Sequence, residues 1–257
     1  MRAALAESAD PADAVHLQRF FKTGPGEYGE GDVFIGVRVP ATRLVVKRFR
    51  GLDPGEIELL LDSEVHEHRL AAVLLLVAAY PRDPESVFVQ YLAAVARDMI
   101  NRGFTSSRRL GVMGASQGGL LATATFIQNP SLFNAVVAQV PLTDMLRYPR
   151  LSAGASWLAE YGDPNDPMQR AAILRWSPYH NIKAGVKYPR AFFLASTRDD
   201  RVHPAHARKM AAKLQANGHP YLYFETTEGG HDAARTLRQR AEQLALTFTY
   251  FRQQLMD

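Results

Sequence analysis

The sequence predicts an α/β protein in which a parallel sheet covered by helices follows a short, mainly helical segment. From residue 81 onward, short apolar runs of strand character alternate with longer runs that have helical apolar spacing. This alternation is typical of parallel sheets whose strands are joined by helices. Residues 1–80 lack the alternation and contain only short amphipathic helix patterns around a glycine-rich region. We therefore expect two domains, 1–80 and 81–257.

The second domain is predicted to contain alternating elements in the order that a parallel sheet needs. Helices are expected over residues 91–101, 120–128, 166–175, 204–216 and 232–255. Strands are expected over residues 109–113, 135–140, 191–196 and 221–225. The fourth helix has Pro204 at its start and Asn217-Gly218 at its end, which is the usual asymmetry of helix termini.

The first domain is predicted to be helical at three places. Amphipathic patterns cover residues 17–21, 56–61 and 64–80. Between the first two lies a turn region at 24–31 that is rich in glycine. Within the third pattern, residues 73–77 could equally form a buried strand. The polar run at 64–69 that precedes them favours the helix.

Composition excludes several classes of function. The chain has no cysteine, so disulfides, thiolate metal sites and cysteine nucleophiles are excluded. Its 47% apolar residues are enough for a packed core, and 22% charged residues is ordinary. The first 13 residues do not resemble a signal peptide, and the longest apolar stretch, 70–80, is too short to span a bilayer. We therefore expect a soluble, cytoplasmic protein.

The net charge of +4 does not indicate a nucleic-acid-binding protein. Residues 1–80 hold 9 Lys and Arg against 12 Asp and Glu, a net charge of −3, so the remainder carries +7. This positive charge is scattered, and no dense basic run with interleaved aromatic residues occurs. We interpret it as solvated surface and expect neither a nucleic acid nor a membrane as partner.

One short motif carries most of the functional information. It reads Gly114-Ala115-Ser116-Gln117-Gly118-Gly119 and lies between a predicted strand and a predicted helix. A G-x-S-x-G sequence in this context is the nucleophile elbow of α/β-hydrolases, in which a strained turn exposes the serine hydroxyl. The glycines leave room for the turn and for close packing of the helix on the sheet. The chain is therefore predicted to be a partial α/β-hydrolase with Ser116 as nucleophile.

The partners that a serine nucleophile needs follow it in the expected order. A serine hydroxyl requires a base, and that base must be oriented by a third group. Asp199 and Asp200 follow the strand at 191–196, and His231 follows the strand at 221–225. Loops at the carboxyl ends of parallel strands are where open α/β sheets place their sites. His231 is the candidate base, and the pattern alone does not choose between Asp199 and Asp200.

Other histidines compete weakly for the role of base. His203 and His206 flank the start of a predicted helix, so we interpret them as surface or capping residues. His180 is a minor candidate. His66 and His68 lie in the first domain, and their spacing alone is weak evidence for a metal site.

Residues 85–257 resemble the catalytic domain of the prolyl oligopeptidase family, serine peptidases that cleave after proline in short peptides. Six ordered motifs carry the resemblance: Gly-Ala-Ser-Gln-Gly-Gly at 114–119, Val-Pro-Leu-Thr-Asp-Met-Leu-Arg at 140–147, Trp-Leu-Ala-Glu-Tyr-Gly at 157–162, Ser-Pro-Tyr-His-Asn at 177–181, Asp-Asp-Arg-Val at 199–202 and Gly-Gly-His at 229–231. The resemblance implies Ser116 as nucleophile, Asp199 as the orienting acid and His231 as base. It implies no cofactor and no metal.

The same resemblance implies a substrate pocket. Trp157 would stack on the substrate proline, with Tyr161 and Val202 lining the pocket and Arg201 holding a backbone carbonyl of the substrate. An aromatic face suits a flat apolar ring, because little polar surface must be desolvated. The alternative for Trp157 is an ordinary core tryptophan. The backbone N–H of Gln117 would supply one oxyanion donor.

The chain also departs from the family. Members carry further strands before the helix at 91–101, a tyrosine that is the second oxyanion donor, and usually a β-propeller; no segment of this chain matches them. Losing one oxyanion donor costs on the order of 10²–10³ in rate. The missing strands would leave the edge of the strand before Ser116 uncovered.

A second resemblance covers residues 17–80, which are similar to the start of the HEAT-like DNA alkylation repair proteins. It rests on the strings at 18–32, 36–40 and 66–70. Isolated helical repeats are weak without neighbours to stack on.

For the chain as a whole, the expected substrate is a short peptide or a small acyl compound. A relaxed-specificity esterase, an inactive remnant and a DNA-binding helical module are the alternatives.

Overall fold

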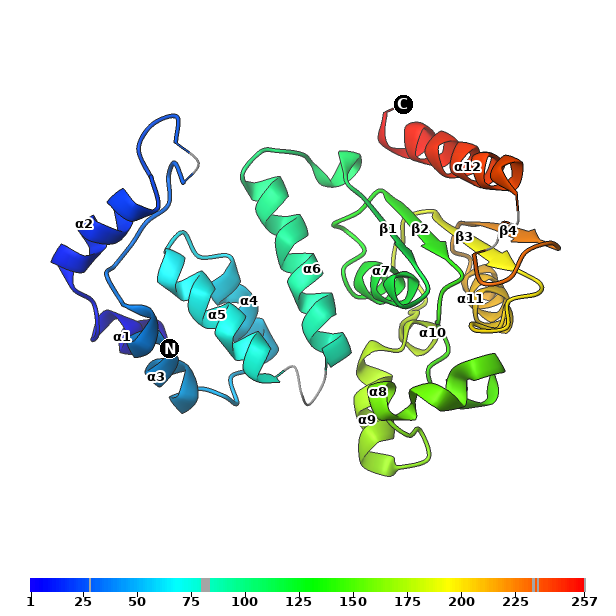
Figure 1. Cartoon of the computed structure of the whole chain (residues 1–257), viewed down its shortest axis with the longest axis horizontal. Coiled ribbons are helices and arrows are strands. Elements are labelled where there is room, and N and C mark those ends of the chain that lie inside the picture. The colour runs from blue at the N-terminus through cyan, green and yellow to red at the C-terminus, as the bar shows by residue number, and fades with distance from the viewer. Residues whose placement is uncertain (28, 80–83, 233, 235, 257) are drawn as a thin grey trace. The chain divides into compact units, whose positions relative to one another are not determined.

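The computed structural model of the chain describes residues 1–27, 29–79, 84–232, 234 and 236–256. The chain folds into two compact units, Met1–Val87 and Phe88–Asp257. Figure 1 draws the first in blue to cyan and the second in cyan to red. The expected junction near Pro81-Arg82-Asp83-Pro84 lies, apart from Pro84, outside the described residues.

The first unit is helical. Its helices are α1 (Arg2–Ala6), α2 (Pro11–Phe20), α3 (Val39–Arg48), α4 (Pro54–Leu61) and α5 (His66–Ala79). Residues 73–77 belong to α5, so the helical alternative is the correct one there. Asp10 and Asp53 cap α2 and α4 by accepting hydrogen bonds from backbone N–H groups of the first turn, and a proline follows each of them.

A buried glutamate joins α5 to the loop before α3. Glu67 is 1% exposed, and its carboxylate accepts hydrogen bonds from the backbone N–H groups of Ile35 (3.2 Å), Gly36 (2.8 Å) and Val37 (3.1 Å). Gly36 has a φ of +81°, and a Cβ there would lie 1.9 Å from the carbonyl oxygen of Asp10. The loop therefore depends on glycine for its shape and on Glu67 for its hydrogen bonds.

Replacing Glu67 with alanine is expected to destabilise the first unit by about 3 kcal/mol, because three buried N–H groups lose a charged acceptor. Urea denaturation followed by circular dichroism measures the change. The control is Glu64→Ala, since Glu64 is exposed on the approach to the same helix. Equal stability of the two variants would show that the Glu67 carboxylate does not hold the loop.

The second unit is a four-stranded parallel sheet with helices on both faces. Its strands are β1 (Gly111–Ala115), β2 (Ala135–Gln139), β3 (Ala191–Ser196) and β4 (Tyr221–Thr226), in the spatial order β1-β2-β3-β4. The longer helices are α6 (Pro84–Asn101), α7 (Gln117–Gln128), α9 (Pro167–Trp176), α11 (Ala205–Ala216) and α12 (Leu237–Leu255). The short helical segments are η1 (Ser107–Arg109), η2 (Tyr148–Arg150), η3 (Ser152–Trp157), α8 (Leu158–Tyr161) and α10 (Pro178–Asn181).

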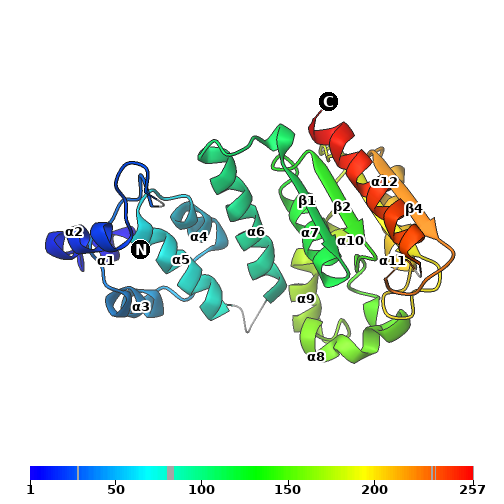
Figure 2. The same cartoon turned by 45° about the horizontal axis from the view of Figure 1, so that its top comes forward.

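The two faces of the sheet are covered by different helices. Val136 and Ala138 of β2 pack into one cluster with residues of α7 and α11. Ala135 and Val137 of the same strand pack on the other face with Tyr250 of α12. This alternation buries β2 on both sides, as expected for a central parallel strand. Figure 2 shows α12, in red, lying over the strands.

The strand before Ser116 lies at the edge of the sheet. β1 pairs with β2, and no other strand of the described residues pairs with it. Met113 of β1 is 49% exposed. Residues 33–49 and 71–78 of the first unit supply no strand, because they lie mainly in α3 and α5. The uncovered edge is therefore the one expected from the missing strands.

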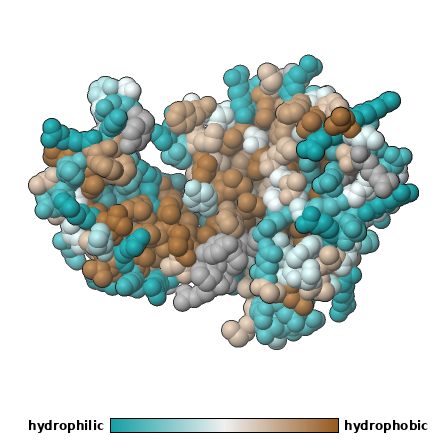
Figure 3. All heavy atoms as spheres, viewed as in Figure 1, coloured by the Kyte–Doolittle hydropathy of each residue, from teal (hydrophilic) through white to brown (hydrophobic). Residues whose placement is uncertain are grey.

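Large apolar side chains are exposed on two helices of the second unit. On α6 they include Tyr91 and Val95, and on α12 they include Leu244 and Phe248. Figure 3 shows apolar atoms at the surface over α6. Neither of these helices, nor any other in the described part of the chain, has the length and apolarity needed to cross a membrane.

Candidate active site

Ser116 stands in a sharp turn between β1 and α7. Its backbone has φ 57° and ψ −119°, a conformation that residues other than glycine rarely adopt. The flanking glycines make the turn possible, since a Cβ on Gly114 would lie 1.9 Å from the carbonyl oxygen of Gly118. A Cβ on Gly119 would lie 2.9 Å from Pro141. The local geometry is therefore that of a strained turn presenting a serine at the carboxyl end of a strand.

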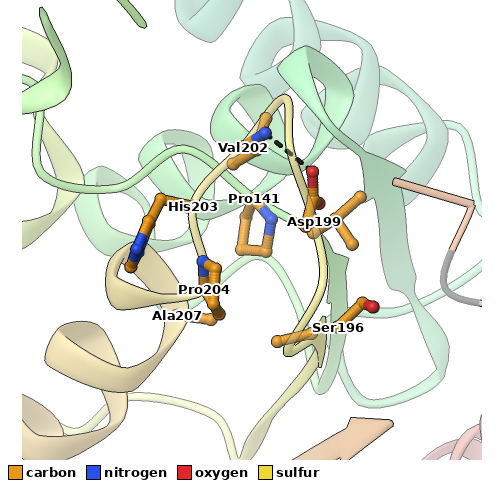
Figure 4. Close-up of a pocket in the computed structure, with 9 residues that line it drawn as sticks. Pro141, Ser196, Asp199, Val202, His203, Pro204 and Ala207 are labelled. Carbon is orange, nitrogen blue, oxygen red and sulfur yellow. Dashed lines mark hydrogen bonds between the residues drawn. The ribbon is translucent and has the colours of Figure 1, made fainter. Parts of the chain in front are cut away.

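Asp199, which is buried, and His231, which is partly buried, form a hydrogen-bonded pair beyond the ends of β3 and β4. Nδ1 of His231 lies 2.9 Å from Oδ2 of Asp199 and 3.1 Å from its Oδ1. Asp199 is 5% exposed, and the backbone N–H groups of Arg201 (2.9 Å) and Val202 (2.8 Å) donate to its Oδ1. Figure 4 shows the carboxylate facing the Val202 N–H. Asp200, by contrast, is exposed.

The strand topology places Ser116 and His231 at the same end of the sheet, the one formed by the carboxyl ends of the strands. β1, β3 and β4 run parallel, so Ser116, Asp199 and His231 all follow the carboxyl ends of strands. In the described structure, no hydrogen bond joins the Ser116 hydroxyl to His231. Such contacts are often long in the absence of substrate and tighten in the reacting complex. With Nδ1 held by Asp199, Nε2 is the His231 atom left to receive a proton.

Gln117 begins α7, so its backbone N–H lies at the N-terminus of a helix, where partial positive charge stabilises an anion. Its side-chain amide donates a 3.0 Å hydrogen bond to Glu160 of α8. This bond connects the turn that bears Ser116 with the helix that bears Tyr161. The arrangement supplies one donor of the kind that an oxyanion site needs.

The expected pocket residues lie in one apolar cluster. Tyr161 and Val202 are buried in it, Trp157 packs against it, and the rings of Trp157 and Tyr161 meet edge to face at 6.4 Å. Leu120, on the first turn of α7, belongs to the same cluster. The other members are Leu142, Met145, Leu146, Tyr148, Ile173 and Trp176. Trp157 is only partly buried.

The segment before Trp157 is attached to the loop that carries Asp199. The Ser152 hydroxyl donates to the carbonyl oxygen of Asp199 (3.4 Å), and Ala153 N–H donates to that of Arg201 (3.4 Å). The Arg201 side chain is exposed. Figure 4 shows a small recess at this loop, lined by Pro141 and His203 among others. His203 accepts from the Ala205 N–H (3.0 Å), which is the capping role expected for it.

The expectation for His206 was wrong. Instead of lying at the surface, it is 1% exposed, and its Nδ1 accepts hydrogen bonds from the backbone N–H groups of Thr143 (3.2 Å) and Asp144 (3.1 Å). Burial lowers the pKa of His206 to about 4, and the charge of Lys209 acts in the same direction against that of Asp144. The available signal was the spacing of His206, Met210 and Leu214 on the buried face of α11.

The stability of the protein is expected to fall as the pH drops from 6.5 to 4. An unfolded His206 takes up a proton near pH 6.5, whereas the folded residue resists protonation until about pH 4. The stabilisation is therefore complete above pH 6.5 and declines by about 1.4 kcal/mol per pH unit below it. Urea denaturation at several pH values should show a shallower pH dependence for His206→Gln than for wild type. The exposed-site variant His16→Gln should keep the wild-type dependence; equal slopes for all three would contradict the assignment.

The remaining histidines of the first unit have local partners. Nδ1 of His66 lies 2.8 Å from Asp32, and Nδ1 of His68 lies 2.8 Å from the Ser63 hydroxyl. Within the part of the chain that the structure describes, no three His, Asp or Glu side chains gather as metal ligands would. His66 and His68 thus act in the packing of α5.

Comparisons with known proteins place most of the chain in a known family. Residues 80–257 match the family model of the prolyl oligopeptidase family, and residues 1–102 match that of the DNA alkylation repair enzymes. An uncharacterized peptidase, y4nA, of Sinorhizobium fredii is 56% identical over 164 residues, covering 64% of this chain and 23% of its own length. A prolyl endopeptidase of Elizabethkingia miricola is 37% identical over 166 residues, covering 63% and 23%.

Solved structures show the same relationship. A post-proline cleaving enzyme from Rickettsia typhi superposes with a TM-score of 0.65 at 35% identity, covering 67% of this chain and 25% of that one. The chain spans 23% of the length of each of the two curated relatives named above. The similarity therefore covers the second unit of this chain and a minor part of each relative.

Proposed function

Because the chain belongs to the prolyl oligopeptidase family, whose model matches residues 80–257, we propose that it is a serine peptidase that cleaves short peptides after proline. The observation that carries the proposal is the hydrogen-bonded Asp199–His231 pair at the carboxyl end of the strands, where Ser116 also stands in its strained turn. In this proposal Ser116 is the nucleophile, His231 the general base and Asp199 the group that orients it.

The reaction proceeds in two steps. His231 Nε2 takes the proton of the Ser116 hydroxyl while the Ser116 Oγ bonds to the carbonyl carbon of the substrate. The Gln117 N–H stabilises the resulting oxyanion. The C–N bond then breaks, His231 protonates the leaving amine, and Ser116 keeps the acyl group. Water, deprotonated by His231, releases the acid and restores the serine.

Specificity is proposed to come from the apolar cluster beside Ser116. Trp157 offers a partly exposed aromatic face for a proline ring, with Tyr161 and Val202 behind it. Arg201 projects from the Asp199 loop and would bind a substrate carbonyl. A residue with a long or charged side chain does not match this lining, because its polar atoms would be left unpaired.

The uncovered edge of β1 is where the further strands of the family are missing, and the tyrosine that is the second oxyanion donor is missing with them. This favours a second candidate, an esterase of relaxed specificity. With a single oxyanion donor, amide hydrolysis loses on the order of 10²–10³ in rate. An ester, which has a better leaving group, tolerates that loss more readily. An inactive remnant is the third candidate, since the Gln117 N–H is the one oxyanion donor that the sequence identifies.

The first domain is proposed to contribute no DNA repair activity. Residues 1–80 carry a net charge of −3, which opposes binding to the phosphate backbone. We propose the domain division at 80/81, with the helical fragment before it and the partial hydrolase after it. Retention on DNA that falls as salt rises would revive the DNA-binding alternative.

Labelling with a fluorophosphonate probe tests the proposed function. Native protein should be phosphonylated, and mass spectrometry of the digested product should place the adduct on Ser116. Competition between a glycyl-proline chromogenic ester and a short-chain acyl ester then separates the peptidase from the esterase. The peptidase proposal predicts faster turnover of the prolyl compound. Native protein that remains unlabelled would overturn both enzymatic candidates.

A further inference from the structure

A second cluster of titratable side chains adjoins the residues of the candidate pocket. We call it the Asp144 network, and it consists of Asp144, Arg147, His180, His206 and Lys209. Asp144 is 0% exposed, and its Oδ2 accepts hydrogen bonds from Lys209 and from Arg147 (3.0 Å). Burial raises the pKa of Asp144, but the hydrogen bonds from Lys209 and Arg147 outweigh it, so the net pKa is lowered. The carboxylate is therefore kept charged in the interior.

The other oxygen of the carboxylate is unusual. Oδ1 of Asp144 is buried without a hydrogen-bond partner among the described residues, and His180 Nε2 faces it at 3.7 Å. Nδ1 of His180 lies 2.8 Å from the Ser177 hydroxyl, which also accepts from the Met145 N–H (3.2 Å). The contacts of the Asp144 network thus run from Asp144 to His180, then through the Ser177 hydroxyl to the backbone N–H of Met145.

The elements joined by the Asp144 network are those that shape the pocket. Asp144 lies between Leu142 and Met145, which both belong to the apolar cluster with Tyr161, Val202 and Trp157. Its partners Lys209 and His206 lie on α11, which begins just after the loop of Asp199 and Val202. The network therefore ties the chain after β2 to the helix that follows the acid loop.

Burying this carboxylate needs a reason other than stability. Desolvation of two charges often offsets their attraction, so an apolar pair of similar volume could be as stable. A buried carboxylate paired with a partly exposed cation on another element, as Asp144 is with Lys209, ties the two elements together, because separating them leaves the buried charge unpaired. At Asp144 those elements are the loop of Leu142 and Met145 and the start of α11.

We propose that Asp144 is a positioning residue that sets the shape of the prolyl pocket, holding the loop of Leu142 and Met145 against Val202. The proposal deepens the proposed function and rests on it for the identity of the pocket. Asp144 touches neither Ser116 nor His231 in the described structure, so it acts on substrate binding through the pocket rather than on the acylation step.

The two tryptophans of the chain permit a test that needs no catalysis. Trp157 packs against the pocket cluster, and Trp176 is buried in it. Protein labelled with fluorotryptophan gives one fluorine resonance for each, assigned with a Trp176→Phe variant. For Asp144→Asn we expect a shifted and broadened Trp157 resonance. Titration with N-acetyl-glycyl-proline should show affinity reduced about tenfold, because the pocket is misplaced.

A matched control and a second variant complete the test. Asp98→Asn removes the carboxylate of an exposed ion pair with Arg102 and should leave both readouts unchanged. Lys209→Met keeps a long unbranched side chain but removes the ammonium group, which hydrogen-bonds to Asp144 and lies 4.7 Å from the centre of the Tyr179 ring. It should reproduce the Asp144→Asn effects if the latter variant does not fold. Reaction of Ser116 with fluorophosphonate, which needs no proline, should change by less than about twofold.

The outcomes separate this proposal from the proposed function. Native protein that is not phosphonylated would overturn the hydrolase, while the Trp157 resonance would still report the effect of Asp144 on the pocket. An unchanged Trp157 resonance and unchanged prolyl affinity in the folded Asp144→Asn variant would overturn the positioning role. Equal losses in prolyl binding and in phosphonylation, together with loss of cooperative unfolding, would also overturn it in favour of a general structural role.

Discussion

Replacing Ser116 with alanine is expected to lower kcat for any hydrolysed ester or peptide by about 10⁶. In the proposed mechanism the Ser116 hydroxyl forms the acyl intermediate, and alanine removes it while leaving His231 hydrogen-bonded to Asp199. Alanine also fits the turn less well than glycine does, but no worse than serine, since both carry a Cβ at φ 57°. The fold should therefore persist.

The measurement is steady-state turnover of the preferred chromogenic ester, alongside phosphonylation of the same preparations. Ser106→Ala is the control, because Ser106 is exposed and makes no side-chain cap for the segment that it precedes. Turnover by Ser116→Ala comparable with that of Ser106→Ala would assign the activity to another nucleophile or to a contaminant. Unfolding by urea should be similar for both variants.

The parallel sheet and the positions of its strands were predictable from the sequence because its strands are short apolar runs between turn residues. The predicted strand at 191–196 has the bounds of β3, and the predicted strand at 221–225 is one residue shorter than β4. Helix α3 was not predicted from the sequence, because Pro40 near its start and several β-branched residues are unfavourable in helices. Its buried residues are Thr42, Val45 and Val46. Proline is well tolerated in a first helical turn, so the observed start is physically reasonable.

The last helix begins later than predicted. The sequence prediction started it at residue 232, but α12 begins at Leu237, where Thr236 and Gln239 form a capping box. The hydroxyl of Thr236 accepts from the Gln239 N–H (3.2 Å), and the Gln239 side chain accepts from the Thr236 N–H (3.1 Å). Apolar periodicity does not locate such a boundary, whereas the Thr-x-x-Gln spacing does.

The candidate site was only partly accessible to sequence reasoning. The G-x-S-x-G motif and the order of acid and histidine are local signals, and each can be read within a few residues. The choice between Asp199 and Asp200 was open, because it depends on which carboxylate turns inward to meet His231, 32 residues away. The hydrogen-bond partners of His206 lie 62 and 63 residues from it, so they could not be identified from its neighbours, although its spacing with Met210 and Leu214 was a local sign of burial.

Replacing Asp199 with asparagine is expected to lower kcat by about 10⁴ while the site keeps its shape. Asparagine is isosteric, and its carbonyl oxygen can still accept from the N–H groups of Arg201 and Val202. Its amide group then faces Nδ1 of His231 as a donor. Nδ1 must become an acceptor, which moves the ring proton to Nε2, and a protonated Nε2 cannot take the proton of Ser116.

The adjacent residue provides the matched control for this change. Asp200→Asn is the same substitution one position along an exposed stretch of the same loop, and it should retain activity within about twofold. The pH dependence of the Asp199→Asn variant gives a further test of the mechanism. Raising the pH should restore its activity only to the extent that hydroxide from solution replaces His231 as the base. If Asp200→Asn lost as much activity as Asp199→Asn, charge in the loop rather than orientation of His231 would be the controlling factor. Equal activity of Asp199→Asn and wild type would show that His231 adopts the reactive tautomer without an orienting acid. Asp199 would then have no role in the mechanism.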